Sequence, residues 1–265
     1  VAQDITEPLE TDERVDYILH TASNADPVAY ALYPSETLLT NIIGAKNVLD
    51  YCREHPKTRL LLTSTFEVYG HIAGKTDDYR ESDSGEIDLN AIRSCYPESK
   101  KCAEILMRCY RKQYGVDWVI ARLCSIYGPT MAETDSKAHA QFLRNGLEGQ
   151  NIVLKSKGLQ RRTYCYLMDT VSALLYTLFN GESGEAYNIS NEHSVASIAE
   201  VAETVARICG TKVVYELPDA VESQGFSRPQ HCILNNDKLK ALGWSGAYTL
   251  EEGLRSTIEI IRQSK

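Results

Sequence analysis

Two hydrophobic patterns alternate along the first half of the chain. Short, nearly continuous apolar runs predict buried strands at residues 17–20, 59–64 and 117–123, and a further short strand at 1–5. Helical spacing of apolar residues predicts a helix over 35–54, capped by Ser35, and another over 96–114 with Pro97 in its first turn. Strands that alternate with helices in this way are typical of a parallel sheet covered on both faces, so we expect an α/β fold.

The rhythm changes after Gly128 and Pro129. Shorter strands are predicted at 152–154, 163–166, 185–189 and 212–217, mixed with helices over 137–147, 168–180, 197–209 and 250–262. We therefore expect two domains, a parallel-sheet domain over 1–130 and a smaller α+β lobe over 131–265, some of whose elements return to the first domain. A single α/β domain with additions is the alternative.

Composition narrows the class of protein. A net charge of −8 gives no basic field for nucleic acid. The 8 cysteines form no C-x-x-C pair and the 6 histidines never lie close together, so neither a zinc site nor a disulfide framework is predicted. Scattered thiols, the lack of a signal peptide and the lack of a long apolar segment together predict a cytoplasmic protein that does not enter a membrane.

One helical pair has chemical potential. Tyr96 and Lys100 are four residues apart and share a helix face. A lysine ammonium beside a phenol favours the phenolate, which lowers the tyrosine pKa and makes a general base for a sugar or alcohol hydroxyl. A tyrosine and a lysine on a solvated helix face are the structural alternative.

Polar residues follow the strand predicted at 59–64. This strand leads into Thr65, Glu67 and Tyr69, and such side chains at the carboxyl end of a parallel strand lie where open α/β sheets bind ligands. Simple capping of the strand exit is the alternative.

Several motifs occur in a fixed order along the chain. They are Asp4-Ile5, D-Y-I-L-H-T-A-S (16–23), Asn41 in T-N-I-I-G-A-K-N-V-L, S-T-F-E-V-Y-G (64–70), Tyr96-x-x-x-Lys100, A-R-L-C-S-I-Y-G-P (121–129), G-L-Q-R-R-T-Y-C-Y-L-M-D (158–169) and A-L-G-W (241–244). In this order the sequence resembles the extended short-chain dehydrogenases/reductases, the NAD-dependent nucleotide-sugar epimerases, dehydratases and decarboxylases.

The resemblance implies a Rossmann-like doubly wound sheet, a C-terminal substrate lobe and NAD as cofactor. It places cofactor-binding residues at Asp4, Ile5, Thr21, Ala22, Ser23, Asn41, Tyr96 and Lys100. It implies that Tyr96 takes the proton of a sugar hydroxyl at C4, that Lys100 supports it, and that Thr65 donates to the reacting oxygen. The ketone then permits epimerisation, elimination or decarboxylation, while the cofactor carries the redox chemistry.

Two neighbouring residues bear on the reaction. Glu67 stands where the family's dehydratases and decarboxylases carry Glu, so it is expected to act as a second acid or base. Phe66 stands where hexose 4,6-dehydratases place an acidic Asp, which disfavours that subgroup. Epimerase-like and decarboxylase-like enzymes both remain open.

The resemblance also implies a nucleotide-diphosphate sugar as substrate and a homodimer formed through the helices at 35–54 and 96–114. Arg162 and Arg228 match phosphate-binding arginines, whose planar fork suits phosphate oxygens. Ser125 replaces a substrate-binding Asn of the family. The sugar, the nucleotide base and the choice between NAD and NADP stay open.

One family motif is absent. The sequence holds no G-x-x-G-x-x-G, the loop whose backbone approaches the cofactor pyrophosphate. We therefore expect an N-terminally truncated Rossmann domain that binds NAD weakly or not at all. A non-catalytic relative acting as a ligand-binding or scaffold module is the second hypothesis, although Thr65, Tyr96 and Lys100 argue against it. An α/β-hydrolase is excluded because G-x-S-x-G is missing.

Overall fold

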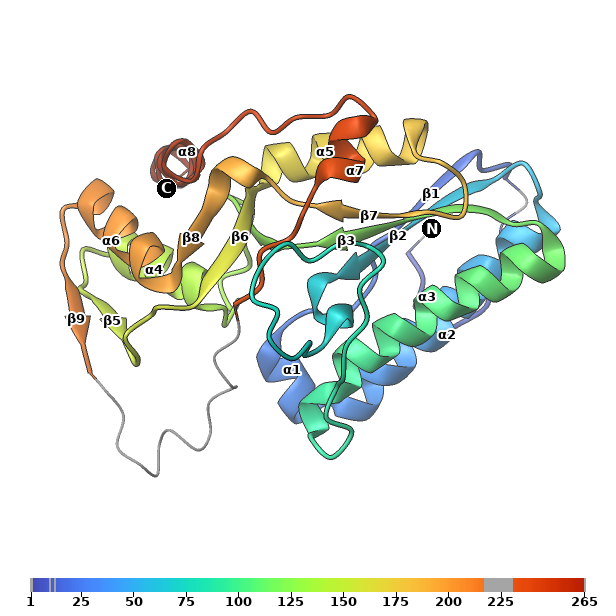
Figure 1. Ribbon diagram of the computed structural model, residues 1–265, viewed down its shortest axis with the longest axis horizontal. Coiled ribbons are helices and arrows are strands. Elements are labelled where there is room, and N and C mark those ends of the chain that lie inside the picture. The colour runs from blue at the N-terminus through green and yellow to red at the C-terminus, as the bar shows by residue number, and fades with distance from the viewer. Residues whose placement is uncertain (1, 10, 12, 217–230, 265) are drawn as a thin grey trace.

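Four parallel strands form the larger sheet of the computed structural model, which describes residues 2–9, 11, 13–216 and 231–264 (Figure 1). The strand order is β1-β2-β3-β7, with bounds Tyr17–His20, Arg59–Thr65, Asp117–Leu123 and Ala186–Ile189. All three pairings are parallel, so every strand ends at the same edge of the sheet. Three of these strands begin at the residue expected from the apolar runs.

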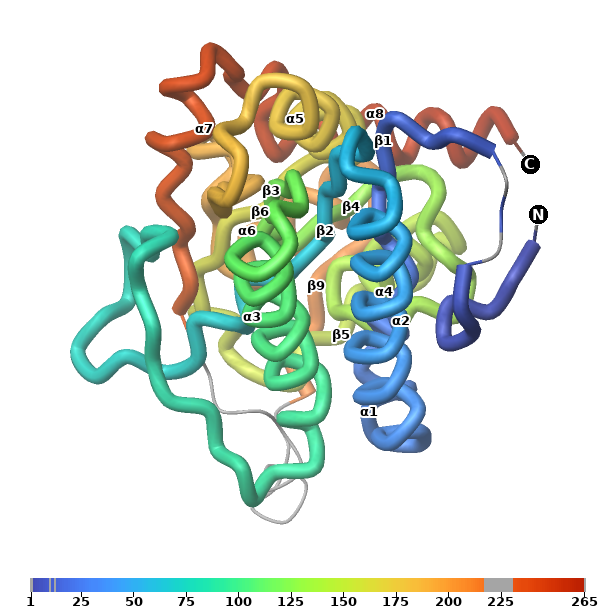
Figure 2. The backbone as a smooth tube through the Cα atoms, turned by 90° about the vertical axis from the view of Figure 1, so that its right-hand side faces the viewer, coloured from blue at the N-terminus to red at the C-terminus, as the bar shows by residue number. Residues whose placement is uncertain are grey.

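Helices cover both faces of this sheet (Figure 1). On one face, α2 (Pro34–Glu54) and α3 (Cys95–Tyr114) pack side by side, as Figure 2 also shows, over Leu60, Leu62 and Trp118. On the other face, α5 (Leu167–Asn180) and α7 (Asp237–Ala241) cover Leu61 and Val119. Successive residues of a strand therefore bury their side chains on opposite faces of the sheet. The expected α/β, Rossmann-like doubly wound arrangement is confirmed.

Two local predictions near the N-terminus were wrong. Residues 2–4 form no strand, because the Asp4 carboxylate accepts from Thr6 N at 2.9 Å and from Thr6 Oγ1 at 2.8 Å and so closes a turn. Helix α2 begins at Pro34, not with Ser35 as its cap. A short helix, α1 (Pro27–Leu32), was not predicted; Asp26 caps it by accepting from Val28 N at 2.9 Å.

The remaining strands build a second lobe. One sheet has the order β4-β6-β8 (Ser125–Tyr127, Arg161–Tyr166, Val195–Ser197), and β5 (Ile152–Leu154) pairs with β9 (Val213–Tyr215). Helices α4 (Ala138–Leu147), α6 (Ile198–Cys209) and α8 (Leu250–Gln263) enclose its core. Strand β7 and helix α5 follow residue 130 in the chain but pack with the larger sheet. A domain boundary at residue 130 stays a prediction.

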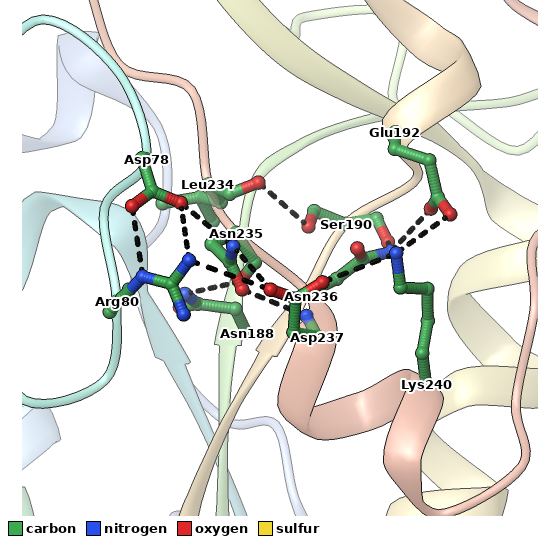
Figure 3. A network of polar contacts seen from close by, with 10 residues as sticks. All are labelled: Asp78, Arg80, Asn188, Ser190, Glu192, Leu234, Asn235, Asn236, Asp237 and Lys240. Carbon is green, nitrogen blue, oxygen red and sulfur yellow. Dashed lines mark hydrogen bonds and ion pairs between the residues drawn. The ribbon is translucent and has the colours of Figure 1, made fainter.

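A polar network holds two long loops against the end of β7 (Figure 3). Asn188 donates to Tyr79 O at 2.9 Å and to Asn235 O at 2.8 Å, and Asn236 donates to Ser190 O at 2.9 Å. Arg80 adds a link to Asp78 within the first loop. Because buried amide side chains satisfy backbone carbonyls here, both loops are fixed beside the carboxyl ends of the strands.

Apolar side chains remain exposed on the edge strand β1 and on the neighbouring helix α5. Strand β1 pairs with β2 alone among the described residues, and Tyr17 and Leu19 are exposed on it. Helix α5 adds an exposed stripe at helical spacing, made of Met168, Val171, Leu175 and Phe179. Tyr17 and Phe179 join the two parts in an edge-on ring contact with centroids 5.1 Å apart. No helix within the described ranges is long and apolar enough to cross a membrane.

Candidate active site

The carboxyl end of β2 meets one face of α3, and this contact assembles the predicted catalytic residues. The hydroxyls of Thr65 and Tyr30 hydrogen-bond to the Tyr96 hydroxyl. Thr65 also accepts from Glu67 N at 3.3 Å, which begins the 3-10 turn η1 (Phe66–Tyr69). Thr65 Oγ1 therefore accepts from the backbone and has its proton to give to Tyr96.

Lys100 lies one helical turn further along α3. Its Nζ donates to Thr63 O at 3.0 Å and the side chain is buried. Burial lowers the Lys100 pKa to about 8, against the attraction of Glu104. His20, at the end of β1, feels the same ammonium: burial and then Lys100 lower its pKa to about 4. The ends of β1 and β2 thus converge on Lys100.

The expected depression of the Tyr96 pKa was wrong for this state of the site. Burial, followed by the negative charge of Glu67, raises the Tyr96 pKa to about 12. Hydrogen bonds from Thr65 and Tyr30 oppose this rise. The physical reason is desolvation, which disfavours the phenolate and which helical spacing alone does not reveal.

Glu67 is held by an arginine that the sequence analysis did not single out. Arg93 Nη1 lies 2.6 Å from Glu67 Oε2, and Arg93 Nη2 lies 3.1 Å from Oε1, a two-pronged pair. The Arg93 guanidinium also lies over the ring of Tyr30, 5.7 Å from its centroid. The Tyr30 ring stacks on Tyr96 with centroids 4.5 Å apart and an interplanar angle of 14°. A carboxylate, a guanidinium and two phenols thus form one cluster.

The missed residues stand on short elements. Tyr30 lies on the six-residue helix α1, and Arg93 lies on the 3-10 turn η2 (Ile92–Ser94) just before α3. Neither element is long enough to show a hydrophobic period. The Asp26-Pro27 pair, a common helix start, was the available signal for Tyr30.

The predicted cofactor residues Thr21, Ala22 and Ser23 directly follow His20, the last residue of β1, whose pKa Lys100 lowers. Asn41 of α2 reaches the same helix face, because its Nδ2 donates to Ser99 Oγ at 2.9 Å. Ser23 Oγ and Asn41 Oδ1 are both buried without a hydrogen-bond partner. Buried polar atoms without a partner are costly, so these two residues fit a polar ligand such as the nicotinamide half of NAD.

Asp4 and Ile5 lie beside α2, near Gly44 and Asn47, closer to the C-terminal end of the helix than Asn41. Asn47 Nδ2 donates to Ile5 O at 3.0 Å, and Ile5 packs closely on Gly44. The Asp4 carboxylate is exposed, and hydrogen bonds from Thr6 lower its pKa. Their contact with adenine stays a prediction.

Ser125 and Arg162 lie on neighbouring strands of the second lobe. Ser125 begins β4 and pairs with Tyr164 of β6, the strand that also carries Arg162. Arg162 Nε is buried without a hydrogen-bond partner, and the Arg162 backbone bridges to Cys232, a thiol close enough to feel both Arg162 and Glu67. Cys232 thus links Arg162 to the surroundings of Glu67, and the substrate-binding roles of Ser125 and Arg162 stay predictions. Arg228 lies outside the described residues.

Potential metal ligands are scattered over the part of the chain that the structure describes. No group of three or more His, Cys, Asp or Glu side chains lies close enough together there to hold a metal ion. The described site is instead built from hydroxyls, one ammonium and one carboxylate–guanidinium pair.

Comparisons with known sequences agree with this geometry. Residues 2–190 match the model of the NAD dependent epimerase/dehydratase family. The chain is 34% identical over 256 residues to UDP-glucuronic acid decarboxylase 6 of Arabidopsis thaliana, covering 96% of this chain and 71% of that protein. It is 33% identical over 263 residues to UDP-glucuronic acid decarboxylase 1 of Danio rerio, covering 98% of this chain and 60% of that protein.

Solved structures show the same fold. A dTDP-glucose 4,6-dehydratase from Bacillus anthracis in complex with NAD superposes with a TM-score of 0.78 at 26% identity, covering 94% of this chain and 73% of that one. A UDP-glucose 4-epimerase from Thermotoga maritima with UDP-glucose gives a TM-score of 0.82 at 24% identity, covering 94% of this chain and 78% of that one.

Proposed function

Because the chain belongs to the NAD-dependent epimerase/dehydratase family, we propose that it decarboxylates a nucleotide-diphosphate sugar that carries a carboxylate at C6. The substrate class follows the relatives named as UDP-glucuronic acid decarboxylases. The sugar is oxidised at C4, loses CO2 from C6 and is reduced again.

The Arg93–Glu67 pair carries this proposal. A guanidinium that binds a carboxylate through two hydrogen bonds lies beside Tyr96, within the catalytic cluster. A neutral hydroxymethyl group at C6 gives such a guanidinium no charge to bind, whereas a C6 carboxylate matches its planar fork. In this proposal, the substrate carboxylate competes with Glu67 for Arg93 and leaves Glu67 available as an acid or base.

The residues around Lys100 would hold the cofactor. Ser23 and Asn41 offer buried oxygens without partners, and Lys100 keeps two ammonium protons beyond the one it gives to Thr63 O. NAD, when bound, supplies the reversible acceptor of one hydride from the sugar.

Tyr96 and Thr65 would handle the C4 oxygen. Tyr96 accepts the proton of the C4 hydroxyl, and the Thr65 hydroxyl donates to the same oxygen as it becomes a ketone. Because burial and Glu67 raise the Tyr96 pKa, the phenolate needs compensating positive charge; Arg93 lowers the Tyr96 pKa, and in this proposal Lys100, one turn along the same helix face, adds to this effect.

The C4 ketone makes the C6 carboxylate part of a β-keto acid. When the C5–C6 bond breaks, CO2 leaves and the bonding electron pair becomes an enolate on the C4 oxygen, which Thr65 and Tyr96 stabilise by hydrogen bonds. One proton then adds at C5, and we assign its delivery to Glu67, which the substrate carboxylate has released from Arg93. The net change is one proton taken up and one CO2 released.

A 4-epimerase is the second candidate. The epimerase fold neighbour and the shared Thr65, Tyr96 and Lys100 set support it, because oxidation at C4 is common to both reactions. Epimerisation needs no acid at C5 and no guanidinium at C6. The Arg93–Glu67 pair therefore favours the decarboxylase.

The test supplies NAD and UDP-glucuronic acid to the protein that carries this sequence, with CO2 release and sugar NMR as readouts. We expect one CO2 per sugar converted and a pentose product. Tyr96→Phe should abolish turnover. Arg93→Met should lower turnover on the acid about 100-fold through lost orientation, with Arg93→Lys recovering only part of it.

UDP-glucose is the matched control substrate. Interconversion of UDP-glucose and its C4 epimer without CO2 release from the acid would assign the epimerase. A fully active Arg93→Met variant would contradict the role given to that residue.

We also propose that the protein forms a homodimer. Helices α2 and α3 carry exposed apolar side chains at Leu39 and Ile105, which a second copy would cover.

We further propose a reducing, cytoplasmic location. All 8 cysteines are free thiols, as a reducing compartment favours.

A further inference from the structure

Helix α3 binds β2 through three side chains spaced four residues apart. Tyr96 hydrogen-bonds to Thr65, Lys100 donates to Thr63 O at 3.0 Å, and Glu104 Oε1 accepts from Ser64 Oγ at 2.6 Å. Three consecutive strand residues are therefore each held by one residue of a single helix face. The third contact, through Glu104, has no part in the chemistry described above.

Glu104 is the centre of a buried ion pair. Arg122 of β3 donates from Nε to Glu104 Oε1 at 3.0 Å and from Nη2 to Oε2 at 2.7 Å, and both side chains are buried, at 7% and 5% exposure. Arg122 is fixed further by Glu81 O at 2.9 Å and by the face of the Tyr69 ring. The carboxylate therefore has both oxygens engaged by donors and is almost completely shielded from solvent.

We propose, on the basis of the proposed function, that Glu104 is a positioning residue: it holds the end of β2 against α3 and keeps the buried Lys100 ammonium charged, so that Tyr96 can act. A gain in stability does not by itself explain a buried ion pair, because desolvating two charges often costs as much free energy as their attraction returns. A role in keeping Lys100 protonated does explain why a carboxylate is buried here.

The groups that face Lys100 decide the sign of the effect. Glu104 lies one turn along the same helix and attracts the ammonium, which raises the Lys100 pKa. His20 faces it from β1 and stays neutral because its own pKa is about 4. The backbone carbonyl of Thr63 faces it from β2, and from β3 Arg122 approaches through Glu104.

Removing the charge of Glu104 should lower the pKa of Lys100, so that Lys100 loses its proton at a lower pH. Glu104→Gln keeps the size of the side chain and can still accept from Ser64, but it leaves Arg122 unpaired. We expect the Lys100 pKa to fall from about 8 by roughly one unit or more. The ammonium loses the attraction of Glu104, and the positive charge of Arg122 is no longer neutralised. The alkaline limb of kcat should move to lower pH by the same amount, with KM little changed.

The primary measurement is NMR titration of lysine-labelled protein, with the Lys100 signal assigned by its loss in Lys100→Arg. Glu104→Gln/Arg122→Met removes both charges, and its Lys100 pKa should recover part of the way toward the wild type. Asp169→Asn is the matched control, since Asp169 is a buried carboxylate in the first turn of α5, away from α3, and accepts from Asn191 and Tyr248. It should lower the melting temperature and leave Lys100 unmoved.

The titration needs no turnover, so it separates this inference from the proposed function. A Lys100 signal that titrates alike in wild type and folded Glu104→Gln would overturn the role of Glu104, whatever the enzyme does. A shifted Lys100 in a protein that releases no CO2 would uphold Glu104 and contradict the decarboxylase.

Discussion

His139 shows, at the scale of a single residue, what burial does to a titratable group. The ring lies on α4, edge-on to Tyr164, and its Nε2 is buried without a hydrogen-bond partner. Burial lowers the His139 pKa to about 4, and the nearby charges of Asp135 and Lys137 change this little because they act in opposite directions.

This pKa predicts a loss of stability in acid. The unfolded chain takes up a proton at this histidine below about pH 6.5, whereas the folded chain does so only near pH 4. The unfolded state therefore binds more protons in that window, and the free energy of unfolding falls as pH falls from 6.5 to 4. His139→Phe should remove up to about 3 kcal/mol of that fall, as measured by urea unfolding at several pH values.

His193 is the matched control, because its side chain is exposed. His193→Asn should leave the pH dependence as it is. An unchanged slope in His139→Phe would mean that the ring takes up its proton over the same pH range in the folded and the unfolded chain.

The candidate site was predictable where its residues follow regular elements. Tyr96 and Lys100 share a helix face and Thr65 ends a strand, which makes them candidates, and the ordered family motifs then identify them as the catalytic set. Tyr30 and Arg93 were missed because they stand on a six-residue helix and a three-residue turn. The direction of the Tyr96 pKa shift was missed because desolvation depends on side chains brought from elsewhere in the chain.

At the scale of elements, the presence of an apolar pattern decided what could be predicted. Strands β3 and β5 and helices α3 and α6 have bounds within one residue of those expected. Strands β4 and β8 are as short as β5, with three residues each, but they lack its continuous apolar run and so resemble a loop. Such strands exist because a partner strand pairs with them, which is tertiary information.

Helix α8 gives a test of element packing. Gly253 faces Tyr127 of β4, and a Cβ at this position would overlap the Tyr127 hydroxyl. Gly253→Ala gains about 1 kcal/mol of helix propensity, but overpacking of this kind costs about 1–3 kcal/mol. We expect a net loss of stability in chemical denaturation, with exposed Glu259→Ala nearly neutral. A stabilised Gly253→Ala would mean that α8 can move away from β4.

At the scale of the whole molecule, the proposed dimer can be tested through α2 and α3. Leu39 is 48% and Ile105 is 59% exposed, which is unusual for large apolar side chains on the longest helices. Ile105→Glu should convert dimer to monomer in chromatography with light scattering, because a buried, unpaired carboxylate is costly. Leu159→Glu, at a 67% exposed position of the second lobe, should leave the mass unchanged.

The edge of β1 that no described strand covers has a consequence for how the protein fails. Its backbone groups, which pair with no other strand among the described residues, and the adjoining stripe on α5 can recruit another extended segment once heating loosens the fold. Loss of activity on heating would then be irreversible, and its apparent midpoint would rise with scan rate and fall with concentration. A lysine at exposed Leu19, which charges that edge, should slow the decay far more than it changes the folding equilibrium.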